Sequence, residues 1–166
     1  MQVAVASTQE ASHRTKSVTA HGKRDRSRDT AQAMSARDQE RISTLRRVYE
    51  SFSLADFDTA IERAHPDIEF VPVGGRAPTQ GAEALRAWME PDAFEQQRAE
   101  PREFQVRGDK VLVLVHTWGR GAGSGIELNI DMWNVWTFDD DGRVTRLEVF
   151  LPDQHGKALE AAGLSE

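Results

Sequence analysis

The sequence predicts an α+β fold in which a curved antiparallel sheet packs on N-terminal helices and forms a cone-shaped roll. Two observations lead to this prediction. Helical periodicity is concentrated between residues 35 and 90, and the last third of the chain holds long apolar strands joined by short turns. Helices segregated from an antiparallel sheet are typical of α+β domains. A long sheet that curls over helices also predicts a hollow of ligand size.

Two helices are expected at the start of the domain. Ser35 and Asp38 fit a capping box, in which two side chains satisfy free backbone amides of the first turn. Apolar residues then recur at three- and four-residue spacing on one helix face: Ile42, Leu45, Val48, Tyr49 and Phe52. Asp56 can cap a second helix. We expect that helix to end at Pro66, because the residue before a proline disfavours helical geometry.

A short strand at residues 68–73 is expected to precede a third helix. This helix starts at Thr79 or Gly81, and Pro91 stops it. Its apolar side is formed by Leu85, Trp88 and Met89. Residues 91–101 are polar, and we expect them to be irregular.

The last third of the chain should form a meander of four strands and a closing helix. The first of these strands begins near Phe104 and turns at Gly108 and Asp109 into the apolar run 111–115. Further strands are expected at residues 126–138 and 144–151, and a terminal helix at residues 158–164.

The composition argues against several classes of function. The chain has no cysteine, which rules out disulfides and suits a cytoplasmic location. Residues 1–37 carry a net charge of +4 and the remainder −10, and so acidic a body disfavours nucleic acid. No run approaches the ~20 apolar residues that span a membrane, so we expect no membrane partner.

No metal or cofactor is expected. The five histidines show no helical spacing suited to metal ligands. The glycine-rich segment 119–125 lacks the GxGxxG spacing of a phosphate loop and leads into a strand rather than a helix. We interpret it as a hairpin turn.

The domain is predicted to span residues 35–166. Residues 1–34 are polar and contain few large apolar side chains, so they are expected to form a disordered tail. A natural start at Met34 is an alternative that the sequence leaves open.

Seven motifs between residues 38 and 164 carry a family resemblance. They are RVYESF at 47–52, DFD at 56–58, HPDIEF at 65–70, GAEAL at 81–85, VWTF at 135–138, DGRV at 141–144 and the closing segment 158–164. They resemble the SnoaL-like branch of the nuclear transport factor 2-like superfamily, which also contains ketosteroid isomerases, limonene epoxide hydrolases and polyketide cyclases. The resemblance implies the cystatin-like roll of that superfamily. It does not name a substrate, because one fold hosts many functions.

The resemblance implies two oxygen-binding residues. Tyr49, the only tyrosine, matches the first-helix tyrosine that donates to an oxyanion in the ketosteroid isomerases, although a core tyrosine is the alternative. Asn134 matches their second donor, and an amide donates without any pKa shift. Strand alternation places Asn134 on one face with Met132 and Trp136. We expect Tyr49 and Asn134 to bind one carbonyl or hydroxyl oxygen of a ligand.

The general base is harder to assign. The isomerases' base falls at Val71, which cannot move protons. Glu69 would share a face with Val71 in a regular strand and is the candidate carboxylate base. A bulge would instead aim Ile68 and Phe70 inward. His116 is a candidate for the pocket, for a dimer interface or for a purely structural role.

Two functions therefore remain open, and whether the chain is an enzyme is uncertain. The first is binding of a small apolar molecule without catalysis. The second is an isomerase, cyclase or hydrolase that acts by proton transfer on a small apolar carbonyl or epoxide. The candidate catalytic residues are Tyr49, Glu69 and Asn134. The candidate ligand-binding residues are Tyr49, Trp88, His116, Met132, Asn134 and Trp136.

A homodimer through the sheet is also predicted. Residues 111–115 are apolar on both faces, which a strand with one solvated face would not be. A second subunit can cover the outer face, where Trp118 and Trp133 are expected.

Overall fold

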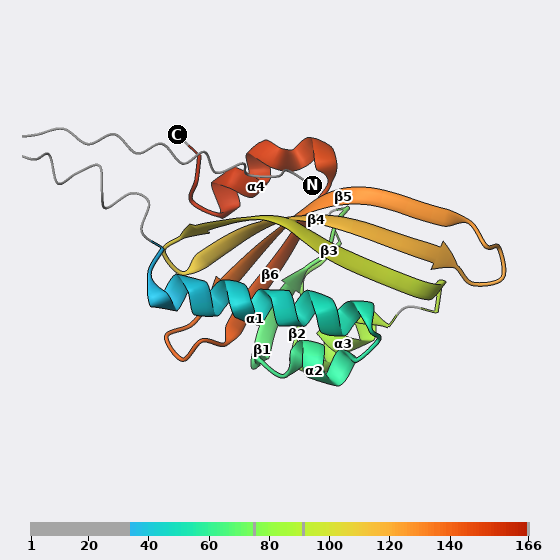
Figure 1. Cartoon of the computed structure of the whole chain (residues 1–166), viewed down its shortest axis with the longest axis horizontal. Helices are drawn as coiled ribbons and strands as arrows, with labels where there is room; N and C mark the ends of the chain where they lie inside the picture. Colours follow the sequence, from blue (N-terminus) through green and yellow to red (C-terminus); the bar gives the residue numbers. More distant parts are fainter. Residues whose placement is uncertain (1–33, 75, 91, 166) are drawn as a thin grey trace, which may run out of the picture. The chain divides into compact units, whose positions relative to one another are not determined.

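A six-stranded sheet and four α-helices make up the part of the chain that this computed structural model describes, residues 34–74, 76–90 and 92–165. This architecture confirms the predicted α+β class (Figure 1). The predicted tail, apart from Met34, lies outside the described residues. None of the described helices has both the length and the apolar character that crossing a bilayer requires.

Helix α1, Ala36–Ser53, begins with the predicted capping box. The Ser35 hydroxyl accepts a hydrogen bond from the Asp38 amide at 3.1 Å, and the Asp38 carboxylate accepts one from the Ser35 amide at 3.3 Å. Helix α2, Phe57–Ile61, is shorter than predicted and does not reach Pro66. The expectation that Pro66 ends the helix was wrong, because Pro66 lies inside a strand. The extended geometry that proline imposes on its predecessor favours a strand just as it opposes a helix.

The sheet has the strand order β2-β1-β6-β5-β4-β3. The strands are β1 Ala64–Val71, β2 Thr79–Gln80, β3 Phe94–Arg107, β4 Lys110–Gly121, β5 Glu127–Phe138 and β6 Val144–Phe150. Strands β3 to β6 form the predicted antiparallel meander. Strand β1 pairs antiparallel with β2 but parallel with β6, so the sheet is not purely antiparallel as predicted.

Strand β3 begins ten residues before the predicted strand start at Phe104, so the expectation of an irregular segment at residues 91–101 was wrong. The strand pairs with β4 along its whole length, from Phe94 opposite Gly121 to Arg107 opposite Lys110. Backbone pairing, rather than an apolar pattern, forms this strand. It lies at the edge of the sheet, where polar residues and a proline are tolerated.

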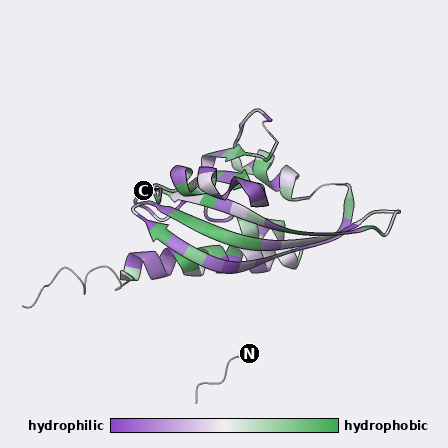
Figure 2. Cartoon of the chain, turned by 90° about the horizontal axis from the view of Figure 1, so that it is seen from above, coloured by the Kyte–Doolittle hydropathy of each residue, from purple (hydrophilic) through white to green (hydrophobic). Residues whose placement is uncertain are grey.

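Two further helices complete the structure. Helix α3, Ala82–Met89, follows Gly81, which is one of its two predicted starts. Helix α4, His155–Ala161, follows a short 3-10 turn and starts three residues earlier than predicted. In Figure 2 the strand ribbons carry long hydrophobic stretches, whereas the helical ribbons alternate between hydrophilic and hydrophobic residues.

The sheet has an inner face that packs on α1 and α3 and an outer face that packs on α4. The main core lies on the inner face and includes Leu45, Phe70, Leu85, Val113 and Leu147. On the outer face, Leu112 and Val135 pack against Ala158 and Ala162 of α4. Helix α4 therefore covers Leu112 within one chain. The apolar character of residues 111–115 on both faces no longer requires a second subunit, although a homodimer stays a prediction.

Candidate functional site

A cavity of about 350 Å³ lies between helices α1 and α3 and strands β3 to β6. Its volume is in the range of sites that bind small molecules. Most of its wall is apolar and includes Val48, Phe52, Trp88, Met132, Trp136 and Val149. Its polar and charged side chains are Tyr49, Arg76, Gln97, Thr117 and Asn134. The lining residues in the described part of the chain include no Asp, Glu or His.

The innermost polar group of the cavity is a hydrogen-bonded cluster of Tyr49, Asn134 and Trp136, called here the tyrosine cluster. Tyr49 comes from the buried face of α1 and is only 4% exposed. Its hydroxyl oxygen accepts hydrogen bonds from Asn134 Nδ2 at 2.9 Å and from Trp136 Nε1 at 2.8 Å. The Tyr49 and Trp136 rings also meet edge to face, with centroids 5.8 Å apart. Alternation along β5 brings Asn134 and Trp136 to this one point.

The tyrosine cluster leaves two hydrogen-bonding positions unused among the described residues. The Tyr49 oxygen accepts two bonds, but its own hydrogen has no acceptor. Asn134 Oδ1 is buried without a partner. Turning the amide over would pair Oδ1 with the Tyr49 hydroxyl and leave an N–H unpaired instead. In either orientation Asn134 presents one unpaired polar atom, which is costly to bury unless a ligand meets it.

Burial keeps the Tyr49 phenol neutral. Desolvation raises the pKa of Tyr49 well above its ordinary value, and the hydrogen bonds from Asn134 and Trp136 lower it only in part. The phenol is therefore a hydrogen-bond donor at physiological pH and not a base. Two N–H groups that donate to its oxygen also make its hydrogen a stronger donor.

Five of the predicted ligand-binding residues line the cavity: Tyr49, Trp88, Met132, Asn134 and Trp136. Trp88 lies nearer to solvent, with 44% of its surface exposed, and its ring packs on Phe70 at a centroid distance of 4.4 Å. The cavity thus extends from an exposed rim at Trp88 to the buried tyrosine cluster.

Glu69 is not among the lining residues, so its prediction as the pocket base was wrong. Its neighbours Ile68 and Phe70 point inward and are 1% and 2% exposed. Glu69 lies on the opposite face, where its carboxylate accepts a hydrogen bond from Arg146 at 2.8 Å. A register irregularity between Ala64 and Glu69 sets this alternation, which is the bulge alternative of the sequence analysis.

His116 is likewise absent from the cavity wall, so its prediction as a ligand-binding residue was wrong. On β4 the inward residues are Val115 and Thr117, and alternation sends His116 to the outer face. There its Nδ1 lies 2.7 Å from a carboxylate oxygen of Asp131, the residue opposite it on β5. The sequence had left this structural role open.

Sequence reasoning missed most of the lining residues, among them Arg76, Phe94, Gln97 and Thr117. Phe94 and Gln97 were missed because β3 was expected to start later. Thr117 could have been predicted from the sequence, because it follows Val115 by two residues and so shares its face of the strand. Arg76 had no usable signal, since it lies in the loop that joins β1 to β2.

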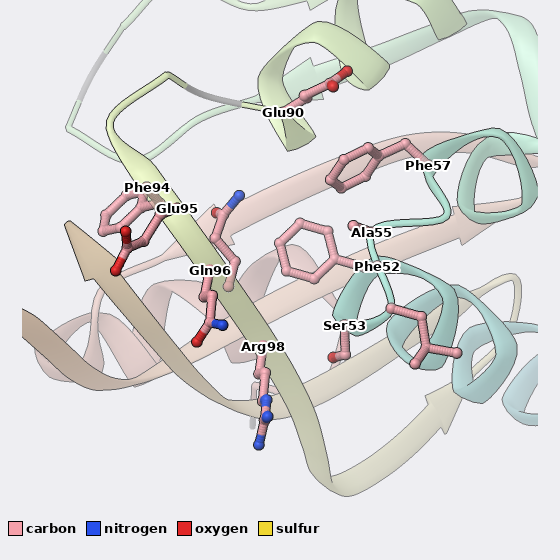
Figure 3. A pocket seen from close by; sticks show the side chains of 11 residues that line it. Phe52, Ser53, Ala55, Phe57, Glu90, Phe94, Glu95, Gln96 and Arg98 are labelled. Carbon is pink, nitrogen blue, oxygen red and sulfur yellow. The ribbon is translucent and has the colours of Figure 1, made fainter. Parts of the chain in front are cut away.

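A second hollow, of about 490 Å³, lies beside the cavity where the ends of α1 and α2 face the start of β3. Figure 3 shows Phe52 and Phe57 on its helical side and Glu95, Gln96 and Arg98 on its strand side. It is larger than the cavity, but much of its wall is exposed and charged. We place the site in the smaller cavity, because only there do buried polar groups converge within apolar walls.

Comparison with known proteins agrees with this architecture. A family model described as a SnoaL-like domain matches residues 45–147. A putative SnoaL-like polyketide cyclase from Jannaschia sp. CCS1 superposes with a TM-score of 0.66 at 19% identity, covering 81% of this chain and 99% of that one. No relative among curated proteins matches the chain.

Two similar structures contain small molecules. TerC, crystallised with polyporic acid, has a TM-score of 0.59 at 24% identity and covers 73% of this chain and 98% of its own. RV0760c from Mycobacterium tuberculosis, in complex with estradiol-17beta-hemisuccinate, has a TM-score of 0.59 at 12% identity and covers 66% and 92%. At these identities the likeness shows the fold alone.

Proposed function

Since this chain belongs to the SnoaL-like domain family, we propose that it binds a small, mostly apolar molecule in the cavity between α1, α3 and the sheet. The tyrosine cluster is the observation that carries this proposal. It presents a neutral donor, the Tyr49 hydroxyl, next to an unpaired polar atom of Asn134 inside an apolar wall. A ligand hydroxyl or enol can accept from Tyr49 and donate to Asn134 Oδ1, whereas a carbonyl oxygen can only accept from Tyr49. Two proteins of the same fold, TerC and RV0760c, hold small molecules, which supports the proposal.

We infer that Tyr49 and Asn134 would meet a ligand oxygen in a different way from the one predicted. We expected two parallel donors, but Asn134 donates to Tyr49 itself. The two residues therefore act in series, with Asn134 and Trp136 strengthening the Tyr49 donor. One strong donor in a low-dielectric hollow binds an oxygen whether or not a reaction follows.

An enzyme acting by proton transfer is the second candidate. Its supporting observation is the same Tyr49 donor, which would stabilise an oxyanion or enol. A carbon acid also needs a base, and the described lining residues include no carboxylate or histidine. Binding without catalysis is therefore the better-supported function.

Matched ligands would test the binding role. We expect 2-naphthol to bind better than naphthalene in calorimetric titrations, because only the naphthol oxygen can accept from Tyr49. Tyr49→Phe should weaken naphthol binding by roughly 3–10-fold, the worth of one neutral hydrogen bond, and leave naphthalene unchanged. Thr117→Phe, which fills the cavity, should abolish both. Binding that survives Thr117→Phe would place the ligand elsewhere and contradict the proposal.

Turnover assays would test the second candidate. Isomerisation of a β,γ-unsaturated ketone or hydrolysis of an apolar epoxide, abolished by Tyr49→Phe, would favour an enzyme. Glu69→Gln serves as the control, because Glu69 lies on the other face and should not affect turnover.

The predicted homodimer, cytoplasmic location and lack of contact with nucleic acid stay proposals. A dimer would use the part of the outer face that α4 leaves uncovered. Trp118, which was expected there, instead lines the cavity. A monomer mass in light scattering at micromolar concentration would contradict it.

A further inference from the structure

Arg76 is the single charged side chain among the described residues that line the cavity. This is unusual in a domain where acidic residues outnumber basic ones, because residues 38–166 carry a net charge of −10. Arg76 is exposed and lies at the solvent end of the cavity, as does the 44% exposed Trp88. The tyrosine cluster lies at the buried end. The cavity therefore has a charged group at its rim and a neutral hydrogen-bonded cluster at its buried end.

Arg76 also differs from most arginines of the domain in having no ion pair with any described residue. Arg86 pairs with both Asp58 and Glu90, and Arg146 lies between Glu69 and Glu148. In each of these pairs a guanidinium nitrogen lies within 4.0 Å of a carboxylate oxygen. Arg76 has no such partner in the part of the chain that the structure describes, so its guanidinium is available to a ligand.

We propose that the ligand of this cavity is an amphipathic organic acid whose carboxylate pairs with Arg76 at the rim. This inference rests on the proposed binding function and names its ligand class. The apolar body lies against Trp88, Met132 and Val149, and any inner oxygen meets Tyr49. A guanidinium binds a carboxylate through two parallel N–H bonds, an arrangement that fixes the orientation of the ligand as well as adding affinity. Among the described lining residues, no other charged side chain competes with Arg76 for the carboxylate.

An isosteric pair of ligands isolates the charge. 2-Naphthoate and 2-naphthamide have nearly the same shape, but only the first is ionised at pH 7. We expect calorimetry to show tighter binding of the carboxylate to the wild-type chain. Arg76→Gln should weaken the carboxylate by roughly tenfold, in the range of a hydrogen bond to a charged group, and change the amide by less than twofold. Arg76→Lys should recover part of the loss.

The controls separate a local contact from a change in net charge. Arg107→Gln removes the same charge from an exposed residue of β3 outside the cavity, and it should leave both affinities unchanged. An equal loss of carboxylate binding in Arg107→Gln would overturn the role of Arg76. So would an amide that binds the wild-type chain as tightly as the carboxylate. In both cases the proposed cavity would stand. If neither ligand binds, or if Thr117→Phe fails to block them, the proposed function itself fails.

Discussion

The two faces of the sheet use polar residues in opposite ways. On the outer face, ionisable side chains pair with one another, as Glu69 does with Arg146 and His116 with Asp131. On the inner face the tyrosine cluster is neutral and keeps an unpaired atom. A charged group is costly to bury unless it is paired, whereas a neutral donor costs less and stays available to a ligand. Ionisable character in the sequence was therefore a poor guide to the cavity, and neutral hydrogen-bonding residues were a better one.

The largest expected difference in stability between the two faces is found by substituting two neighbouring residues of β1. Phe70→Ala should lower the free energy of unfolding by about 3–5 kcal/mol, because it empties a fully buried site of the inner core. Glu69→Ala, one residue away, should cost about 1 kcal/mol or less, because its ion pair is partly exposed. Urea denaturation of both variants measures the contrast. Similar losses in the two variants would mean that Phe70 and Glu69 do not lie on opposite faces of β1.

Tyr49→Phe should give the next largest effect. The phenyl ring keeps the packing, but Trp136 Nε1 and Asn134 Nδ2 lose their acceptor in a buried site. Leaving such groups unpaired costs about 1–3 kcal/mol of unfolding free energy. Tyr49→Phe combined with Asn134→Leu should recover part of that loss, because one unpaired amide is then removed. A Tyr49→Phe variant as stable as the wild type would indicate that water accepts the hydrogen bonds of Asn134 and Trp136 in place of the Tyr49 hydroxyl.

Alkaline pH should weaken the fold through the same phenol. Burial raises the pKa of Tyr49 in the folded chain above the value of about 10 expected when it is unfolded. Below pH 10 both states hold the proton, so this group contributes nothing to a change with pH. Above pH 10 only the unfolded state releases it, so stability should fall by up to about 1.4 kcal/mol per pH unit. The fall should be smaller in Tyr49→Phe.

Absorbance near 295 nm can follow this proton directly, because Tyr49 is the only tyrosine of the chain. The folded protein should show no tyrosinate at pH 10.5, and the protein unfolded in urea should show it clearly. Tyrosinate in the folded state at that pH would contradict the buried position of the phenol.

The smallest expected effect belongs to the outer pair. His116→Gln removes one partner of a cross-strand contact whose side chains are 32% and 58% exposed. Contacts of this kind contribute about 0–1 kcal/mol, and ligand binding should not change. A clear loss of ligand affinity in His116→Gln would show that the outer face takes part in binding.

Much of the fold could be predicted from local patterns. The capping box at Ser35 and the three- and four-residue spacing of Leu45, Val48 and Tyr49 sufficed for α1. Alternation sufficed to place Asn134 and Trp136 together on β5. These signals depend on neighbours close in the chain. The prediction of where β3 begins failed, because pairing with β4, rather than the strand's own composition, makes this segment a strand.

The sequence by itself determined the fold class, because periodicity and turns encode it locally, and its motifs carried the family resemblance that pointed to Tyr49 and Asn134. The tertiary structure alone decided which face Glu69 and His116 occupy, since a register irregularity or a strand partner sets the face and leaves no local signal. It also decided that Arg76, in a loop remote in sequence from Tyr49 and Asn134, lines the same cavity. Side chains from distant segments meet only when the sheet and helices pack, because burial of the shared core brings them together.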